Sequence, residues 1–383
     1  MPTYPTYKLG DVAEIILGQS PESKSYNTKG EGLPFFQGKT EFTDWFPIPN
    51  KWCTEPKKIA EPLDVLLSIR APVGPTNIAK EKCCIGRGLA AIRYADCYKY
   101  VLYYLRSVSK YLESKATGTT FSSISGDTIK NLPIPLPPLP TQHAIVIRIE
   151  TLFAELDKAV LHLRTAQQQL KTYRQAVLNH WLNNEDGKWE MVKLGEVAEM
   201  CLDKMLDKNK NKGTYQPYLR NVNVRWGSFD LDDLLEMKFE ESEQERYGIQ
   251  IGDLIMCEGG EPGRCAIWNA NVPNMKIQKA LHRIRVNNMV FNKFVYCLFT
   301  LYAQNGYLEK YFTGTTIKHL TGQSLKSIEI PLPPLAEQQR IVKEIESRLS
   351  QATASETYIE NALQQAEALR QSILKKAFSG ELV

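Results

Sequence analysis

At 383 residues, the chain exceeds the size at which one hydrophobic core keeps growing, so we expect two globular units with connecting elements. Its 43% hydrophobic, 23% charged and 10% aromatic residues exclude a disordered chain. The apolar runs fall far short of the roughly 20 residues that a membrane helix needs, so the expected setting is cytoplasmic, without a membrane.

The charge of the chain is nearly balanced, with a net value of only +4, so overall electrostatics do not by themselves indicate nucleic acid. Residues 1–140 carry 17 Lys and Arg against 13 Asp and Glu, whereas residues 185–335 carry 19 against 20. A DNA-binding surface in the second stretch must therefore be a local basic face.

The eight cysteines form no CxxC pair, and none clusters with His at zinc-ligand spacing. We predict buried, reduced thiols and no metal site.

Two similar stretches divide the chain. KLGDVAE at residues 8–14 recurs as KLGEVAE at residues 193–199. Short apolar runs bounded by Gly, Pro and Asn follow both copies and predict strands joined by turns. The runs that resemble one another are 33–36 and 216–219, 64–67 and 253–256, and 85–93 and 277–285. One framework with two different sets of surface loops is the simplest interpretation.

Polar side chains that suit DNA follow these strands. Amide and basic groups are the types that contact groove edges and phosphates. The candidates are Gln37, Lys39, Arg70 and Arg87 in the first stretch, and Arg220, Asn223, Arg225 and Lys279 in the second. Arg70, Arg87 and Lys279 are equally compatible with ordinary surface positions.

The longest repeat comes next. Helical spacing at residues 101–112 and 294–308 precedes it, and residues 117–153 then match residues 313–349 at a constant separation of 196 positions. Each copy opens with a glycine-hinged TGTT turn. The turns carry hydroxyl and basic groups at Thr119, Thr120 and Ser123, and at Thr315, Thr316, Lys318 and His319. They are either DNA contacts or capped helix starts.

Proline-rich connectors follow at residues 133–140 and 331–335. Proline fixes φ and removes a hydrogen-bond donor, so we predict stiff extended arms. A role as ligands for proline-binding modules is the alternative.

A long helix is predicted after each connector. The first runs from Thr141, as N-cap, to about residue 182, without Pro or Gly and with a heptad pattern. The predicted coiled-coil seam consists of Ile149, Leu156, Leu163, Leu170 and Val177 in the first helix, and Ile345, Ile359 and Ile373 in the second. The helices bury these stripes most economically against each other, and an antiparallel pair would hold the two units at opposite ends of a rod.

The expected fold class is therefore α+β, with two mixed α/β units in a pseudo-twofold arrangement, separated by an antiparallel coiled coil. The expected domains are residues 1–140, a helix at 141–184, residues 185–335 and a helix at 336–383. The acidic run at residues 230–245 is interpreted as a solvated loop or short helix.

Motifs for catalysis are missing from the sequence. GxxxxGK[ST] is absent, and the Pro-Pro pairs lack the Asn or Asp and the aromatic residue of an amine methyltransferase motif. Three histidines of the first long helix have no metal-ligand partners in the sequence pattern. We predict no catalytic residue and no metal or cofactor on this chain.

The KLGD and KLGE starts, paired TGTT turns, IPLPPL connectors and the C-terminal RQSIL and FSGEL segments together resemble the DNA sequence-specificity subunits of type I restriction–modification systems. The resemblance spans almost the whole chain. It implies two target recognition domains that each read half of a split site in double-stranded DNA, and two conserved helices that set the spacer.

The resemblance also implies partners. The helices would dock two modification subunits, which bind S-adenosylmethionine and methylate adenine, and it leaves open whether a restriction and motor subunit joins them. Two other interpretations compete with this one: a coiled-coil scaffold that binds protein without DNA readout, and a self-contained DNA methyltransferase, which the missing motifs disfavour.

Overall fold

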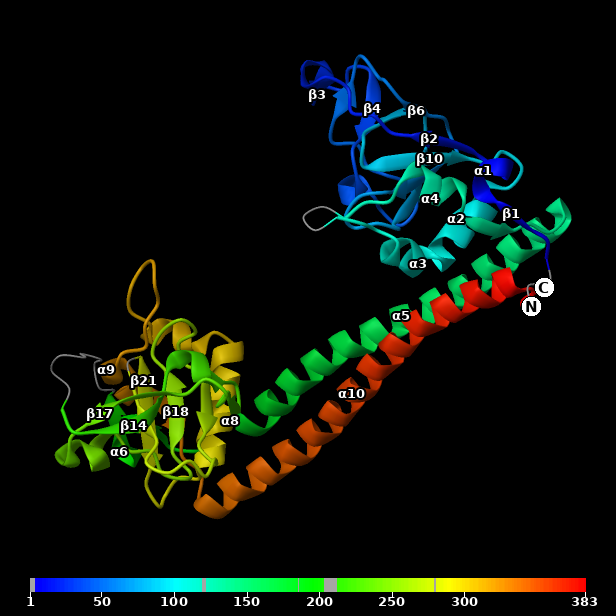
Figure 1. The fold of residues 1–383 in the computed structure, drawn as a ribbon. Coiled ribbons are helices and arrows are strands. Elements are labelled where there is room, and N and C mark those ends of the chain that lie inside the picture. The colour runs from blue at the N-terminus through cyan, green and yellow to red at the C-terminus, as the bar shows by residue number, and fades with distance from the viewer. Residues whose placement is uncertain (1–3, 119–121, 185, 203–211, 279) are drawn as a thin grey trace. The chain divides into compact units, whose positions relative to one another are not determined.

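The computed structural model describes residues 4–118, 122–184, 186–202, 212–278 and 280–383. The chain divides into two compact units (Figure 1). Unit 1 comprises residues 1–164 and 360–383, and unit 2 comprises residues 165–359. Both boundaries fall inside long helices, so each unit includes a part of both helices.

Unit 1 contains two main sheets and a short pair. Strands β2 (Glu14–Leu17), β10 (Leu89–Arg93), β7 (Val65–Ser68) and β8 (Thr76–Ile78) form an antiparallel sheet in that order. The second sheet has the order β3 (Tyr26–Asn27), β5 (Trp52–Cys53), β4 (Leu33–Phe36), β9 (Cys83–Ile85) and β6 (Ile59–Ala60). Strand β1 (Thr6–Lys8) pairs with β11 (Pro133–Pro135).

The helices of unit 1 are short apart from the two that it shares with unit 2. They are α1 (Leu9–Val12), α2 (Tyr98–Ser107), α3 (Ser109–Ser114), α4 (Gly126–Lys130) and the 3-10 turns η1 (Ser23–Ser25) and η2 (Lys39–Glu41). Strand β7 is buried on both faces, because its side chains point alternately into two different hydrophobic cores. Val65 and Leu67 join the core beneath α2, whereas Leu66 joins a second core with Phe36 and Ile85.

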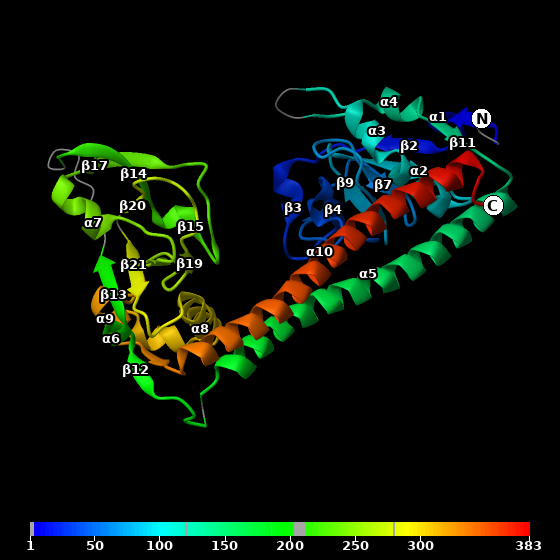
Figure 2. The ribbon, with the colours of Figure 1, turned by 90° about the horizontal axis from the view of Figure 1, so that it is seen from below.

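Unit 2 repeats the same plan (Figure 2). Its antiparallel sheet has the order β13 (Ala198–Leu202), β21 (Leu281–Val286), β18 (Leu254–Cys257) and β19 (Cys265–Ile267), and β12 (Met191–Lys193) pairs with β22 (Glu329–Pro331). Strand β14 (Thr214–Leu219) lies parallel to β20 (Lys276–Ile277), as β4 does to β9. The runs aligned in the sequence therefore occupy equivalent strands.

The remaining elements of unit 2 build its own loops. Strand β17 (Leu235–Phe239) pairs with β14, and β15 (Val224–Arg225) pairs with β16 (Ser228–Phe229). The helices are α6 (Leu194–Val197), α7 (Gln244–Tyr247), α8 (Asn292–Gln304) and α9 (Gly322–Lys326), with 3-10 turns η3 (Asn221–Asn223), η4 (Glu241–Glu243) and η5 (Tyr307–Tyr311).

The prediction for the acidic run needs a correction. Residues 235–239 form β17, and a short helix follows only at residues 244–247. Met237 and Phe239 are buried, so apolar residues alternate with charged ones within the run. With alternate residues on opposite faces of a strand, Met237 and Phe239 lie on one buried face. The high charge of the run hid this alternation in the sequence.

Two long helices complete both units: α5 (Leu139–Leu182) and α10 (Leu335–Ser379) (Figure 1). Helix α5 begins two residues before Thr141, so the prediction of Thr141 as N-cap is wrong. Pro140 fits the first helical turn, where no backbone N–H is needed. Arg370 pairs with Asp157 in unit 1 and Arg174 pairs with Glu356 in unit 2. Asp157 precedes Arg174 along α5, whereas its partner Arg370 follows the partner of Arg174, Glu356, along α10. The two helices therefore run antiparallel.

The predicted seam residues differ in burial. Ile149 and Ile373 belong to the core of unit 1, and Val177 and Ile345 belong to the core of unit 2. The other positions are Ile359, which is buried, and Leu156, Leu163 and Leu170, which are half-buried. The ends of both helices are therefore integral parts of the globular cores.

The repeated residues of the connectors have a structural reason. Gln142 Nε2 donates to Pro137 O at 2.9 Å, and Gln338 Nε2 donates to Pro333 O at 2.8 Å. Both glutamines are buried. Each closes the turn between the proline arm and the long helix, which favours the structural interpretation of the arms.

The TGTT turns are not capped helix starts. The short helices after them are capped by Ser125 and Thr321, whose side chains accept hydrogen bonds from Thr128 N and Ser324 N. Gly314 and Gly118 have positive φ values of 89° and 118°, which glycine adopts readily. Residues 313–316 therefore form a loop that precedes the cap in unit 2, and in unit 1 the cap at Ser125 lies outside the TGTT residues.

All eight cysteines are buried and free of disulfides, as predicted. Burial raises the pKa of Cys83, Cys84 and Cys297 to about 12. In the described parts of the chain, no helix is long and apolar enough to cross a membrane.

Candidate nucleic-acid interface

Backbone hydrogen bonds join four loops of unit 1 into one surface. Gly86 N donates to Phe36 O at 2.8 Å, and Ile69 N donates to Gly88 O at 2.9 Å. Ile124 N in turn donates to Ile69 O at 3.0 Å. The loop at residues 86–88 therefore lies between the end of β4 and the end of β7, and the loop at residues 122–124 borders the latter.

These contacts bring together candidates that are far apart in the sequence: Gln37, Arg70, Arg87 and Ser123. A Cβ atom on Gly88 would lie only 2.3 Å from Gln37 O, so the close approach of two loops requires glycine there. Gln37, Arg70 and Arg87 are exposed, and Ser123 is half-buried in an antiparallel bridge with Arg70.

Unit 2 builds the equivalent surface with equivalent bonds. Gln278 N donates to Leu219 O at 3.1 Å, Glu258 N donates to Ala280 O at 2.9 Å, and Leu320 N donates to Glu258 O at 2.8 Å. The backbone scaffold of the two surfaces is thus the same.

The side chains on this scaffold differ between the units. Gln37 of unit 1 occupies the position of Arg220 in unit 2, directly after the parallel strand. Arg70 corresponds to Gly259, against which the ring of His319 packs. Two surfaces with the same backbone scaffold and different polar side chains can bind ligands of one kind and still distinguish between them.

The remaining candidates divide into three groups. Thr315, Thr316 and Lys318 are exposed, and His319 is half-buried in a bridge with Thr313. Lys39 in η2 of unit 1 is also exposed. Thr119, Thr120 and Lys279 lie outside the described residues.

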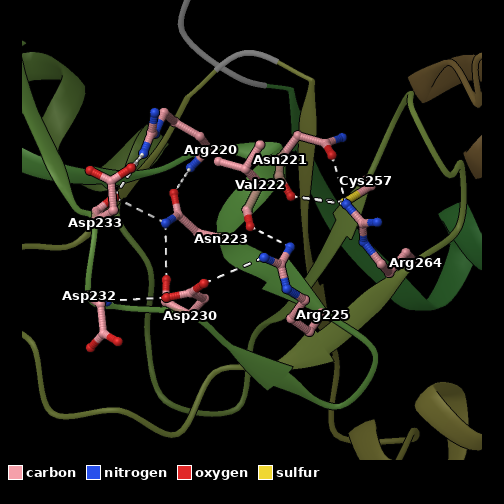
Figure 3. A network of polar contacts seen from close by, with 10 residues as sticks. All are labelled: Arg220, Asn221, Val222, Asn223, Arg225, Asp230, Asp232, Asp233, Cys257 and Arg264. Carbon is pink, nitrogen blue, oxygen red and sulfur yellow. Dashed lines mark hydrogen bonds and ion pairs between the residues drawn. The ribbon is translucent and has the colours of Figure 1, made fainter. Parts of the chain in front are cut away.

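A polar network fixes the loop after β14 (Figure 3). Arg220 Nη2 donates to Asp233 Oδ2 at 2.6 Å and to Asp233 O at 2.8 Å. Arg225 donates through Nη1 to Val222 O at 2.5 Å and through Nη2 to Asp230 Oδ2 at 3.4 Å. The two arginines are therefore oriented by residues of the acidic run.

Asn223, which is predicted to contact DNA, is only 2% exposed, so it lies beneath the loop surface and not on it. Its Oδ1 accepts from Arg220 N at 2.9 Å, and its Nδ2 donates to Asp230 O and Asp233 O. Asn223 joins the loop after β14 to the acidic run from the inside (Figure 3).

Sequence reasoning missed the role of Arg264. Its Nη2 donates to Asn221 O and Oδ1 at 3.1 and 2.8 Å, and its Nη1 donates to Glu261 Oε2 at 2.9 Å. Asn221 Nδ2 donates to Gly259 O at 2.7 Å, which links the loop after β14 to the loop after β18. No spacing in the sequence indicates the contacts that Asn221 makes with Arg264 and Gly259, since they join segments about 40 residues apart.

Within the described residues, no group of three or more His, Cys, Asp or Glu could hold a metal ion. Two copies of one α/β scaffold, each with its own polar loop surface, define a duplicated recognition protein.

Residues 1–162 and 186–365 match the family described as type I restriction modification DNA specificity domain. The chain belongs to this family, so it is a specificity component and not a catalytic one.

Individual relatives agree with this assignment. A putative type I restriction enzyme MjaX specificity subunit of Methanocaldococcus jannaschii is 39% identical over 170 residues, which cover 43% of this chain and 39% of that relative. The EcoKI specificity subunit of Escherichia coli is 25% identical over 90% of this chain and 80% of its own length.

Solved structures share the fold. A chain from a structure of the type I R-M system superposes with a TM-score of 0.80 at 20% identity, covering 100% of this chain and 99% of that chain. The HsdS subunit from Thermoanaerobacter tengcongensis gives 0.64 at 19% identity, covering 100% and 98%. The predicted fold class, with two α/β units and two long antiparallel helices, is confirmed.

Proposed function

We propose that the chain is the DNA sequence-specificity subunit of a type I restriction–modification complex. In this proposal each unit reads one half of a bipartite, asymmetric site in double-stranded DNA. The observation that carries it is the equal backbone scaffold with unequal loop side chains, because two modules with the same scaffold and different contact groups suit two different half-sites.

The partners follow from the same proposal. The long helices set the spacer between the half-sites and dock two modification subunits in the cytoplasm. Those subunits supply S-adenosylmethionine and the methyl transfer to adenine, and restriction and motor subunits bind through them where they exist. The coiled-coil scaffold without DNA readout is not favoured, because the matched family is one of DNA specificity domains.

Selection from random duplexes tests the function. The chain in complex with its modification subunits should enrich a sequence with two fixed half-sites and an unspecified spacer. Failure to enrich any bipartite sequence would contradict the proposal.

A matched variant sharpens this test. Replacing Arg70 and Arg87 together by Ala should abolish selection of one half-site and leave the other unchanged, because both residues belong to unit 1. Equal loss of both half-sites would contradict a separate reading surface on each unit.

A further inference from the structure

The two candidate surfaces differ in whether their basic side chains form ion pairs with acidic residues. Lys39, Arg70 and Arg87 of unit 1 form no ion pair with any residue that the structure describes. In unit 2, Arg220 pairs with Asp233 at 2.6 Å and Arg225 with Asp230 at 3.4 Å. The two surfaces should therefore attract phosphate unequally.

Arg225 combines a fixed position with free donors. A guanidinium has five N–H groups, and Val222 O and Asp230 Oδ2 each accept a bond from Arg225 while its side chain stays 51% exposed. Asp230 is itself held in place, since its Oδ1 accepts from Asp232 N at 3.3 Å and its main-chain O from Asn223.

Arg220 is held more tightly. Nη2 makes both bonds to Asp233, and the side chain is 26% exposed. Asp233 is 75% exposed. An ion pair in such an exposed place contributes little to stability. We therefore interpret the Arg220–Asp233 pair as a device that orients the arginine and not as a stabilising contact of the fold.

We propose that Asp230 and Asp233 are positioning residues for the half-site bound by unit 2: Asp230 holds Arg225 for the paired readout of guanine, and Asp233, which takes both bonds of Nη2, leaves Nη1 of Arg220 for a single bond to a neighbouring guanine. Two parallel N–H donors of an arginine match O6 and N7 of guanine in the major groove. The aspartates also offset the positive charge of these arginines, so Arg220 and Arg225 add little counterion release, whereas a cation without an ion pair adds more.

The inference rests on the proposed function, because it assigns roles within the DNA site of that function. A purely structural role of the aspartates is the competing explanation. The two explanations differ in what the freed arginines do: a misfolded loop loses all DNA contacts, whereas a released arginine becomes an additional phosphate contact.

The test uses Asp230→Asn and Asp233→Asn in the full chain with its modification subunits. Asp232→Asn is the matched control, since Asp232 lies in the same stretch, makes the same charge change and has no arginine partner among the described residues (Figure 3). Affinity is measured for the enriched duplex and for a random duplex over a range of salt concentrations.

For each positioning variant, we expect affinity for the enriched duplex to fall about tenfold and the preference for guanine in the unit 2 half-site to relax. Affinity for random duplex should rise, with the slope of log K against log salt steeper by about one for each freed arginine. The control should show neither change.

Two results would overturn the inference: no difference from the control, or an equal loss of affinity for both duplexes with an unchanged slope and base preference. Failure of the unaltered complex to select any bipartite sequence would instead contradict the proposed function, so the two failures are distinguishable.

Discussion

At the scale of single residues, each unit contains an equivalent ion pair between a buried aspartate and a partly exposed arginine. Arg93 donates through Nε and Nη2 to the two carboxylate oxygens of Asp64 at 3.0 and 2.9 Å, and Arg285 donates likewise to Asp253 at 2.7 and 2.8 Å. Both aspartates are 2% exposed. These hydrogen bonds raise the pKa of Arg93 and of Arg285.

Replacing Asp253 by Ala should lower the free energy of unfolding by about 2–3 kcal/mol, since it leaves a guanidinium without its partner. Asp253 Oδ2 also accepts from Gln250 N at 2.7 Å, which would lose its acceptor. Urea unfolding measures the change, with Asp232→Ala as the exposed control. A loss no larger than that of the control would contradict a structural role.

At the scale of elements, the junction between connector and helix is the feature that repeats most closely. Gln338 Oε1 accepts from Phe291 N at 2.7 Å, and its Nε2 donates to Met289 O and Pro333 O at 3.0 and 2.8 Å. The glutamine thereby ties the start of α10 to the start of α8. In unit 1, Gln142 Oε1 accepts from Tyr94 Oη at 3.2 Å, which ties the start of α5 to the segment before α2.

Gln338→Leu should destabilise the protein by about 2–4 kcal/mol, because buried backbone groups lose their partners at about 1–3 kcal/mol each. Gln339→Leu is the control, since Gln339 is exposed one position later on the same helix. Thermal unfolding compares the two variants. Equal melting temperatures would contradict the importance of this junction.

The elements also show the limits of sequence reasoning. Strands such as β7 and β18 were predictable because an apolar run ends in a turn on both sides, and the long helices because no Pro or Gly interrupts them. Strand β17 was not predictable, because its charged face dominates its composition. Its identity depends on pairing with β14, which lies about 20 residues earlier.

At the scale of the whole molecule, the function depends on two repeated units that share long helices. Arg174 of α5 donates to Glu356 and to Thr353 of α10 within unit 2, and Arg370 of α10 pairs with Asp157 of α5 within unit 1. Each unit therefore includes a piece of both helices. A change in helix length should alter the spacer between the two half-sites and leave the DNA-contacting loops of each unit unchanged.

Inserting four residues, about one helical turn, into α5 should lengthen the spacer of the selected site and leave both half-sites unchanged. Selection from random duplexes measures both properties. A same-length replacement of four exposed residues in α5 is the control. An altered half-site with an unchanged spacer would contradict the role of the helices as a ruler.

The sequence by itself determined the duplication, the class of fold, the long helices and the family. These features depend on periodicity and on residues that match at a constant separation, and both are visible along the chain. The sequence also indicated Gln37, Arg70, Arg87 and Arg220 as polar groups after strands.

Only the tertiary structure decided which of these groups share a surface and which are buried. Gln37 and Arg87 meet because Gly86 and Gly88 pack against the end of β4, and Asn223 is buried because it bonds to the acidic run. Partners such as Asp233 and Arg264 have no sequence signal, because a hydrogen bond depends on three-dimensional proximity and not on separation along the chain.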